Sequence, residues 1–281
     1  MDDLIGPGEL EDAKKHLLDD LFSGLTDSVS RSPVCILLGG QPAAGKTRLI
    51  AKLVEANKER TYITINGDEF RTYHPRYVAL SEHHGAEAPR LTQPFSNALV
   101  EFAKQECLQR RHDMIIEGTM RTFGVIERTV AELRQHNYRV DRHGVAIPAQ
   151  DSLLGIFRRY EGELQLTGFG RFSAIAIHDE AYRQIPHNVQ AAHAQQLFDR
   201  IVLYRRDKSG KLRVGFTIDR DDESEMPPDT IDMFEQARQP IQPNSFYHQQ
   251  WLEIAQLARQ RGETNADYLG QIDGFIRQFA A

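Results

Sequence analysis

The sequence predicts an α/β fold, a mostly parallel β-sheet flanked by helices, with a helical extension at its C-terminal end. Short apolar runs bounded by proline, glycine or polar residues recur along the chain and are typical of buried strands. Between them lie segments whose apolar residues are three and four positions apart, as in amphipathic helices. Because strands that alternate with helices form βαβ units, we expect the strands to run mostly parallel.

Each expected element has a local reason. Residues 9–25 carry leucines and alanine at helical spacing, and the apolar run 34–38 between Pro33 and Gly39 predicts a buried strand. A helix is expected over 47–57 and a β-branched strand over 61–65. The same criteria predict, in order, a helix over 93–109, a strand over 113–116, a helix over 122–135, a strand over 138–147, helices over 151–166 and 174–184 and a strand over 200–204.

The pattern changes past Gly215. Residues 219–228 are acidic and contain proline, which predicts a surface loop, and a helical tail with Trp251 and Tyr268 follows. A separate module of about 50 residues would bury too little surface to be stable alone. We therefore expect one domain over 1–281, with a core over about 30–215 and a helical extension over about 226–281.

The composition limits the classes of function. Of 281 residues, 40% are hydrophobic, and 34 basic against 40 acidic residues give a net charge of −6. This balance disfavours a protein that coats nucleic acid or an anionic membrane. Cys35 and Cys107 form no metal-binding pattern and are typical of a reducing compartment. With no apolar run near the roughly 18 residues of a membrane span, and no signal peptide, we expect a soluble cytoplasmic protein without a membrane partner.

A glycine-rich loop between the first strand and the next helix is the strongest local signal. It matches G-x-x-x-x-G-K-[ST] over Gly40, Gln41, Pro42, Ala43, Ala44, Gly45, Lys46 and Thr47. In such a loop the backbone N–H groups surround nucleotide phosphates, the lysine reaches the β- and γ-phosphates, and the threonine hydroxyl ligates Mg²⁺. The loop therefore predicts ATP and Mg²⁺ as cofactors. No guanine-reading NKxD occurs, which favours ATP over GTP.

Two carboxylates follow neighbouring strands and are expected at the same crevice as Lys46. Asp68, just after the second strand, is placed to accept a proton from a substrate hydroxyl, or else it caps the helix that follows. Glu117 ends the third strand, where it could bind a substrate hydroxyl, support bound Mg²⁺, or be a plain strand-end carboxylate. Arginines from a lid would offset the charge of phosphoryl transfer, and Arg159 and Arg171 are candidates, with a solvated helix face as the alternative for Arg159.

Several motifs in this order resemble the zeta toxin family over residues about 30–205. They are the run 38–42, Asp68-Glu69-Phe70 followed by His74-Pro75, the run 117–122, Arg159-Tyr160-Glu161, Arg171 and His178-Asp179. The resemblance implies a P-loop kinase-like fold. It also implies a bacterial kinase that phosphorylates the 3′-hydroxyl of the amino sugar in UDP-N-acetylglucosamine, which impairs peptidoglycan synthesis. A separate antitoxin protein acting in trans is implied as a partner.

The resemblance also implies roles for single residues. Asp68 would be the catalytic base, and Lys46, Arg159 and Arg171 would stabilise the transferring phosphoryl group. The UDP-sugar would be held by Glu101, Glu117, Thr119 and Arg121. Two departures leave the acceptor open: Ala43-Ala44 where many members have glycine and serine, and Arg142-His143-Gly144, which interrupts a strand.

Two other interpretations stay open. One is a kinase of a different nucleotide-linked metabolite. The other is a nucleic-acid end kinase or nucleotide-dependent binding module, which the acidic balance and the lack of a basic stripe interleaved with aromatics disfavour. We therefore expect a UDP-sugar and no nucleic acid as partners.

Overall fold

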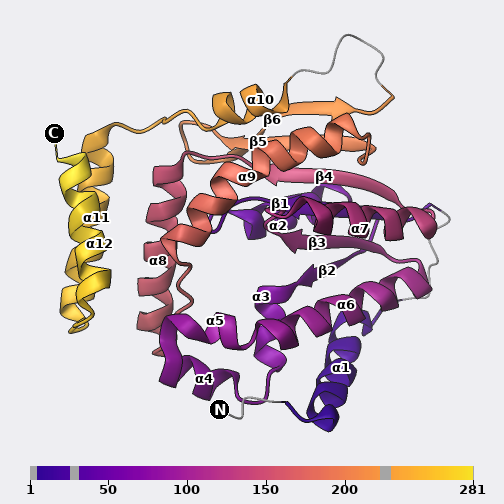
Figure 1. Ribbon diagram of the computed structural model, residues 1–281, viewed down its shortest axis with the longest axis horizontal. Coiled ribbons are helices and arrows are strands. Elements are labelled where there is room, and N and C mark those ends of the chain that lie inside the picture. The colour runs from indigo at the N-terminus through magenta and orange to yellow at the C-terminus, as the bar shows by residue number, and fades with distance from the viewer. Residues whose placement is uncertain (1–4, 26–31, 222–228, 281) are drawn as a thin grey trace.

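The computed structural model describes residues 5–25, 32–221 and 229–280 (Figure 1). Its strands are β1 (Val34–Gly39), β2 (Tyr62–Asn66), β3 (Asp113–Gly118), β4 (Arg139–Val145), β5 (Arg200–Arg206) and β6 (Leu212–Asp219). The longer helices are α1 (Pro7–Phe22), α2 (Lys46–Ala56), α4 (Tyr77–His84), α6 (Gln93–Arg110), α7 (Phe123–Gln135), α8 (Ala149–Thr167), α9 (Ile175–Ala194), α10 (Thr230–Ala237), α11 (Asn244–Gln260) and α12 (Ala266–Phe279). Short helical turns between β2 and α6 are α3 (Gly67–Phe70), η1 (Arg71–Tyr73), η2 (Gly85–Glu87) and α5 (Ala88–Leu91).

The sheet confirms the predicted fold class. Its strand order is β2-β3-β1-β4-β5-β6, and the first five strands are parallel while β6 runs antiparallel to β5. Strand β6 was not predicted. It is an edge strand whose residues are mostly exposed or half-buried, so it carries no buried apolar run that would mark it in the sequence.

The apolar run of β1 is continuous because both faces of the sheet are covered. Cys35 and Leu37 belong to a core cluster with residues of α6, α7 and α9, whereas Ile36 and Leu38 pack on the other face with Leu49 of α2. A strand buried on both faces loses the apolar–polar alternation of a half-exposed strand. This arrangement holds the carboxyl end of β1, where the glycine-rich loop begins, in the middle of the sheet.

Helix α9 is longer than predicted. The expected helix ends at 184, but α9 continues to Ala194 through Pro186. Proline lacks the N–H that the helix needs, so sequence alone places a boundary there. Ile185 and Val189 on either side of it are fully buried in the core, and their packing keeps the helix going.

Arg142-His143-Gly144 does not interrupt its strand, contrary to the prediction. Arg142 pairs in register with Leu37 of β1 and Ile201 of β5, so β4 is continuous. The Arg142 side chain is fully buried, and its guanidinium lies 5.3 Å from the centre of the Phe234 ring. A Cβ at Gly144 would collide with that guanidinium, which explains a glycine at this position.

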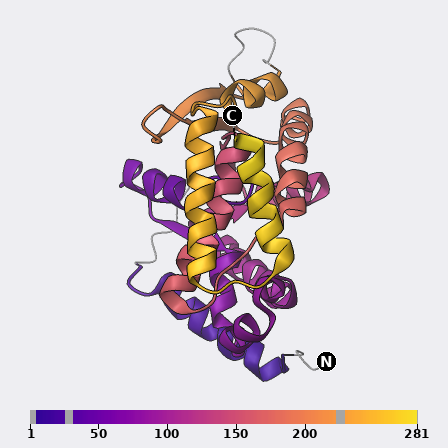
Figure 2. The same ribbon diagram turned by 90° about the vertical axis from the view of Figure 1, so that its left-hand side faces the viewer.

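The C-terminal helices split into two parts. α10 packs against α9 and the sheet, whereas α11 and α12 pack on each other and on α8 (Figures 1 and 2). Helix α8 stands between this pair and the strands in Figure 1. Of the predicted loop 219–228, Asp219 ends β6, and 222–228 lie outside the described residues. Within the described residues, no helix is both long and apolar enough to cross a membrane.

Candidate nucleotide site

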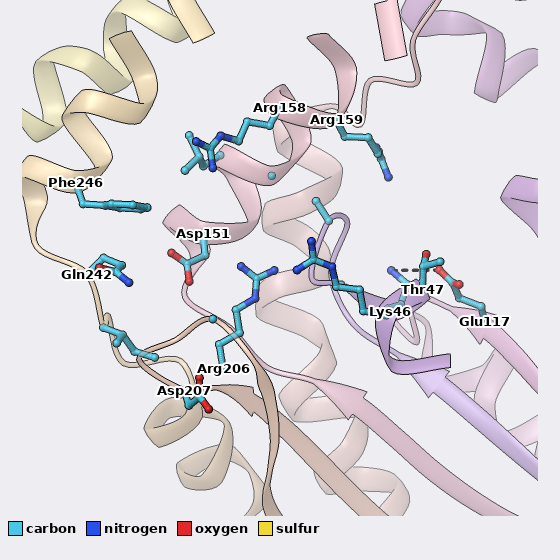
Figure 3. Close-up of a pocket in the computed structure, with 17 residues that line it drawn as sticks. Lys46, Thr47, Glu117, Asp151, Arg158, Arg159, Arg206, Asp207, Gln242 and Phe246 are labelled. Carbon is cyan, nitrogen blue, oxygen red and sulfur yellow. Dashed lines mark ion pairs between the residues drawn. The ribbon is translucent and has the colours of Figure 1, made fainter. Parts of the chain in front are cut away.

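A cavity of about 630 Å³ opens beside the glycine-rich loop, between α8 and the segment that leads into α11 (Figure 3). This volume is within the usual range for small-molecule sites. The cavity is lined by Ala43, Gly45, Lys46, Thr47, Arg48, Glu117, Asp151, Leu154, Gly155, Arg158, Arg159, Arg206, Asp207, Gly210, Ile241, Gln242 and Phe246. Of the eight predicted loop residues, Ala43, Gly45, Lys46 and Thr47 face it.

The loop has the backbone of a phosphate-binding turn. Gly45 precedes α2 with φ +103°, a conformation that glycine adopts without strain. Ala43 has φ +59°, which is strained for a residue with a Cβ. Gln41 points away from the cavity: its amide nitrogen donates to Ile147 O at 3.1 Å and to Ser152 Oγ at 3.4 Å. Gln41 therefore holds the loop against the start of α8.

Lys46 lies at the centre of the site. Its Nζ donates to Gly40 O at 3.2 Å and Gln41 O at 3.4 Å, and lies 3.7 Å from Glu117 Oε1. Burial lowers the pKa of Lys46, while the charges of Glu117 and Asp68 oppose that shift. A half-buried cation that faces the cavity and pairs with one carboxylate at 3.7 Å fits a phosphate ligand. Thr47 is exposed at the cavity, where its hydroxyl fits an ion bound to those phosphates.

Glu117 faces Lys46 across the site. Its Oε2 accepts from Asn66 Nδ2 at 3.2 Å, because the two residues pair in register at the ends of β2 and β3. Burial raises the pKa of Glu117, and the nearby Lys46 cation lowers it. Asn66 was missed by sequence reasoning, although its place at the end of a strand beside β3 was a usable signal.

Asp68 is free of the capping role that was the alternative for it. Asn66 is the N-cap of α3, since its Oδ1 accepts from the Asp68 backbone N–H at 3.0 Å. The Asp68 carboxylate is 57% exposed and lies 3.3 Å from Nε of Arg71, a buried side chain that also donates to Pro89 O and Thr92 Oγ1. Arg71, which sequence reasoning missed, therefore orients a carboxylate that stays open to solvent.

Two of the predicted arginines are in contact, since Arg159 Nη2 donates to the backbone oxygen of Arg171 at 3.5 Å. Figure 3 shows Arg159 reaching from α8 toward the Lys46–Glu117 pair, and its Nη2 donates to Ser173 Oγ at 3.1 Å. Burial lowers the pKa of Arg159, with the Arg171 charge adding to the shift. Arg171 is held by Glu163, to which both its backbone N–H and its guanidinium donate. The Asp68 charge acts on both arginines, so the predicted catalytic groups lie in one electrostatic cluster.

The predicted acceptor residues are more dispersed. Glu117 lines the cavity, whereas Glu101, Thr119 and Arg121 do not. Glu101 is an exposed residue of α6 paired with Lys104 at 2.8 Å. Arg121 pairs with Glu180 of α9 at 3.3 Å, and Thr119 is half-buried just after β3. In the described chain these three residues are not brought together with the Lys46 cluster.

Sequence reasoning also missed Arg206 and Asp151. Arg206 ends β5, the last parallel strand, and Asp151 lies in the first turn of α8. Burial lowers the pKa of Arg206, and the Asp151 charge opposes the shift. The carboxyl end of a parallel strand is where ligands bind in such sheets, so the place of Arg206 was a usable signal.

Comparisons with known proteins identify the family and agree with the fold. The zeta toxin family model matches residues 19–214. Toxin PezT of Streptococcus pneumoniae is 32% identical over 199 residues, which are 69% of this chain and 78% of PezT. A structure from the PezAT chromosomal toxin–antitoxin system of Streptococcus pneumoniae aligns with a TM-score of 0.74 at 23% identity, covering 92% of this chain and 99% of that one.

A more distant structure shares the fold. The AvrRxo1-ORF1:-ORF2 complex solved with ATP aligns with a TM-score of 0.56 at 12% identity, covering 99% of this chain and 91% of that one. The family match spans the glycine-rich loop, both strand-end carboxylates and both arginines. The chain therefore belongs to the zeta toxin family.

Proposed function

We propose that this protein is a kinase that transfers the γ-phosphate of ATP to the 3′-hydroxyl of the amino sugar in UDP-N-acetylglucosamine. The observation that carries the proposal is the half-buried Lys46 cation, which faces the cavity, donates to two carbonyls of its own loop and lies 3.7 Å from Glu117. Membership of the zeta toxin family supports the acceptor. A different nucleotide-linked metabolite is the alternative acceptor.

The residues divide the work of phosphoryl transfer. The loop N–H groups and Lys46 bind the phosphates of the donor, and Arg159 and Arg171 offset the charge that develops on the transferring group. Asp68 accepts the proton of the attacking hydroxyl, in the position that Arg71 gives it. The Thr47 hydroxyl would hold Mg²⁺, whose charge would offset that of the donor phosphates. Glu117 contacts the UDP-sugar at the Lys46 cluster; family membership supports the same role for Glu101, Thr119 and Arg121, which lie outside the cavity lining.

A restraining partner belongs to the same proposal. The matched structure comes from a toxin–antitoxin system, and PezT is named a toxin. We extend this to the present chain: a separate antitoxin protein binds it in trans and the free enzyme impairs peptidoglycan synthesis. The work of such an enzyme is expected in the cytoplasm, where UDP-sugars are made.

Mass spectrometry of UDP-N-acetylglucosamine incubated with the protein, ATP and Mg²⁺ tests the activity. The expected product carries one additional phosphate on the sugar. Parallel reactions offer UDP-glucose, RNA ends or DNA ends as the acceptor instead. Phosphate on a nucleic-acid end and none on either UDP-sugar would overturn the proposal.

Asp68→Asn tests the proposed base. Turnover should fall by about 10²- to 10⁴-fold, the usual contribution of a general base, while ATP binding stays near the wild-type level. Glu69→Gln, at the neighbouring carboxylate, is the matched control and should keep most of the activity. Unchanged turnover in Asp68→Asn would remove Asp68 from the mechanism.

A further inference from the structure

The cavity extends well beyond the phosphate loop. Its wall on the side away from Glu117 is built by Ile241, Gln242 and Phe246, at the start of the C-terminal helical pair (Figure 3). These residues follow the segment that matches the family model, which ends at 214. The C-terminal extension therefore adds a wall to a site whose phosphate end comes from the sheet.

Phe246 is an aromatic ring held in place at the edge of a polar cavity. It is 36% exposed and packs edge-to-face on Tyr247, with ring centres 5.4 Å apart. Tyr247 is fully buried, and its hydroxyl donates to Asp151 Oδ1 at 2.5 Å. This second ring also packs on Phe279 at 5.1 Å. The contacts of Tyr247 with α8 and α12 fix the chain next to Phe246, and the Phe246 ring packs on this fixed neighbour.

The groups between Phe246 and the phosphate loop suit the rest of a nucleotide. The Arg206 guanidinium lies beside the loop, since a Cβ built on Gly45 would lie 3.6 Å from Arg206 Nη2. Gln242 faces the same cavity, and its amide offers a donor and an acceptor side by side. A flat base can stack on an aromatic face and pair with such an amide.

We infer that the C-terminal extension forms the base-binding end of the donor site, with the adenine of ATP stacked on Phe246 and its polar edge on Gln242. This inference rests on the proposed function, because it takes ATP as the donor. Arg206 spans the middle of the site, between the base and the phosphates. The extension is then part of the nucleotide site as well as a support for α8.

Binding measurements that separate base from phosphates test the inference. Isothermal titration of the full chain with Mg²⁺-ATP, and separately with Mg²⁺-tripolyphosphate, compares a ligand with a base and one without. Phe246→Ala should weaken ATP binding about tenfold, the usual loss for one stacked base, and leave tripolyphosphate binding unchanged. Phe246→Trp, which keeps an aromatic ring at this position, should bind ATP with near wild-type affinity. Gln242→Ala should reduce the preference for ATP over GTP.

Leu252→Ala is the matched control, because Leu252 is another exposed apolar side chain of α11 and lies outside the cavity lining. Its ATP affinity should equal that of the wild type. Equal affinity of Phe246→Ala and wild type for ATP, or equal losses for ATP and tripolyphosphate, would overturn the inference. If the wild type binds ATP but transfers phosphate to no UDP-sugar, the proposed activity is contradicted. The ATP and tripolyphosphate affinities of the variants then decide the inference about the base site. A wild type that binds neither ligand would overturn both.

Discussion

Two carboxylates near the cavity differ in their partners: Glu117 lines the cavity, and Glu161 lies outside its lining. On the sheet side, Glu117 has its nearest cation, Lys46, at 3.7 Å, and burial raises the pKa of this carboxyl. On the helical side, Glu161 of α8 is fully buried and accepts from Arg261 at 2.9 and 3.1 Å and from the Tyr268 hydroxyl at 2.7 Å.

The difference separates a ligand site from a structural joint. A carboxylate whose lone pairs are used has little capacity left for a ligand, so Glu161 attaches the C-terminal extension to α8. Arg159 is two positions earlier, and two positions on a helix are about 200° apart, so it faces the cavity instead. One family motif therefore contributes to the site and to the joint that supports it.

The largest effect is expected for an arginine of the ligand site. Arg171→Ala should lower kcat by about 10³-fold or more, because a cation that offsets transition-state charge contributes that much to phosphoryl transfer. Steady-state kinetics with varied ATP and UDP-sugar measure the change. Arg259→Ala, at an exposed arginine of α11 that pairs with Asp273 and lies outside the cavity lining, is the control. A change in KM alone for Arg171→Ala would contradict its role.

Removing the buried Glu161 carboxylate should lower the stability of the protein. Glu161→Ala leaves the buried Tyr268 hydroxyl without its acceptor and removes one of the two carboxylates that pair with Arg261, and we expect a loss of about 3 kcal/mol in the free energy of unfolding. Urea denaturation measures the loss. Glu253→Ala removes a carboxylate from an exposed pair and should cost less than about 1 kcal/mol. Equal losses in the two variants would show that Glu161 is not a joint.

The stability of the sheet is expected to depend on pH through one buried histidine of β4. His143 stacks on Tyr204, and burial, with the Arg142 charge, lowers the pKa of His143 to about 4. Because the folded state prefers the neutral imidazole, its contribution to stability is complete above about pH 6.5 and is lost as pH falls toward 4. The loss is on the order of 3 kcal/mol, as 1.36 kcal/mol per pKa unit implies. Urea denaturation from pH 7 to 4.5 should show a steeper decline for wild type than for His143→Phe; parallel declines would refute it.

The smallest effect concerns the strained loop. Ala43→Gly relieves a φ of +59°, and we expect a gain of about 1 kcal/mol or less after the entropy of glycine is counted. Ala44→Gly, at a fully buried neighbour, should lose about 1 kcal/mol. Thermal unfolding of the two variants should shift the midpoint in opposite directions. A lower midpoint for Ala43→Gly would contradict the strain.

Local patterns were sufficient for much of the fold. The parallel strands and most of the long helices between them were predictable, because a buried strand and an amphipathic helix each show in the spacing of apolar residues, whereas α4 (Tyr77–His84) was not predicted. The exposed edge strand β6 has no such spacing, and the part of α9 beyond Pro186 is held by core packing that a local reading does not see.

The site divides in the same way. The sequence by itself determined the glycine-rich loop with Lys46 and the carboxylates at two strand ends, because neighbouring residues and parallel strands set those positions. Only the tertiary structure decided that Asn66 caps α3, that Glu161 is a joint and that Phe246 reaches the cavity. These contacts join residues up to about a hundred positions apart, as between Glu161 and Arg261, and they exist only when packing and burial bring distant side chains together.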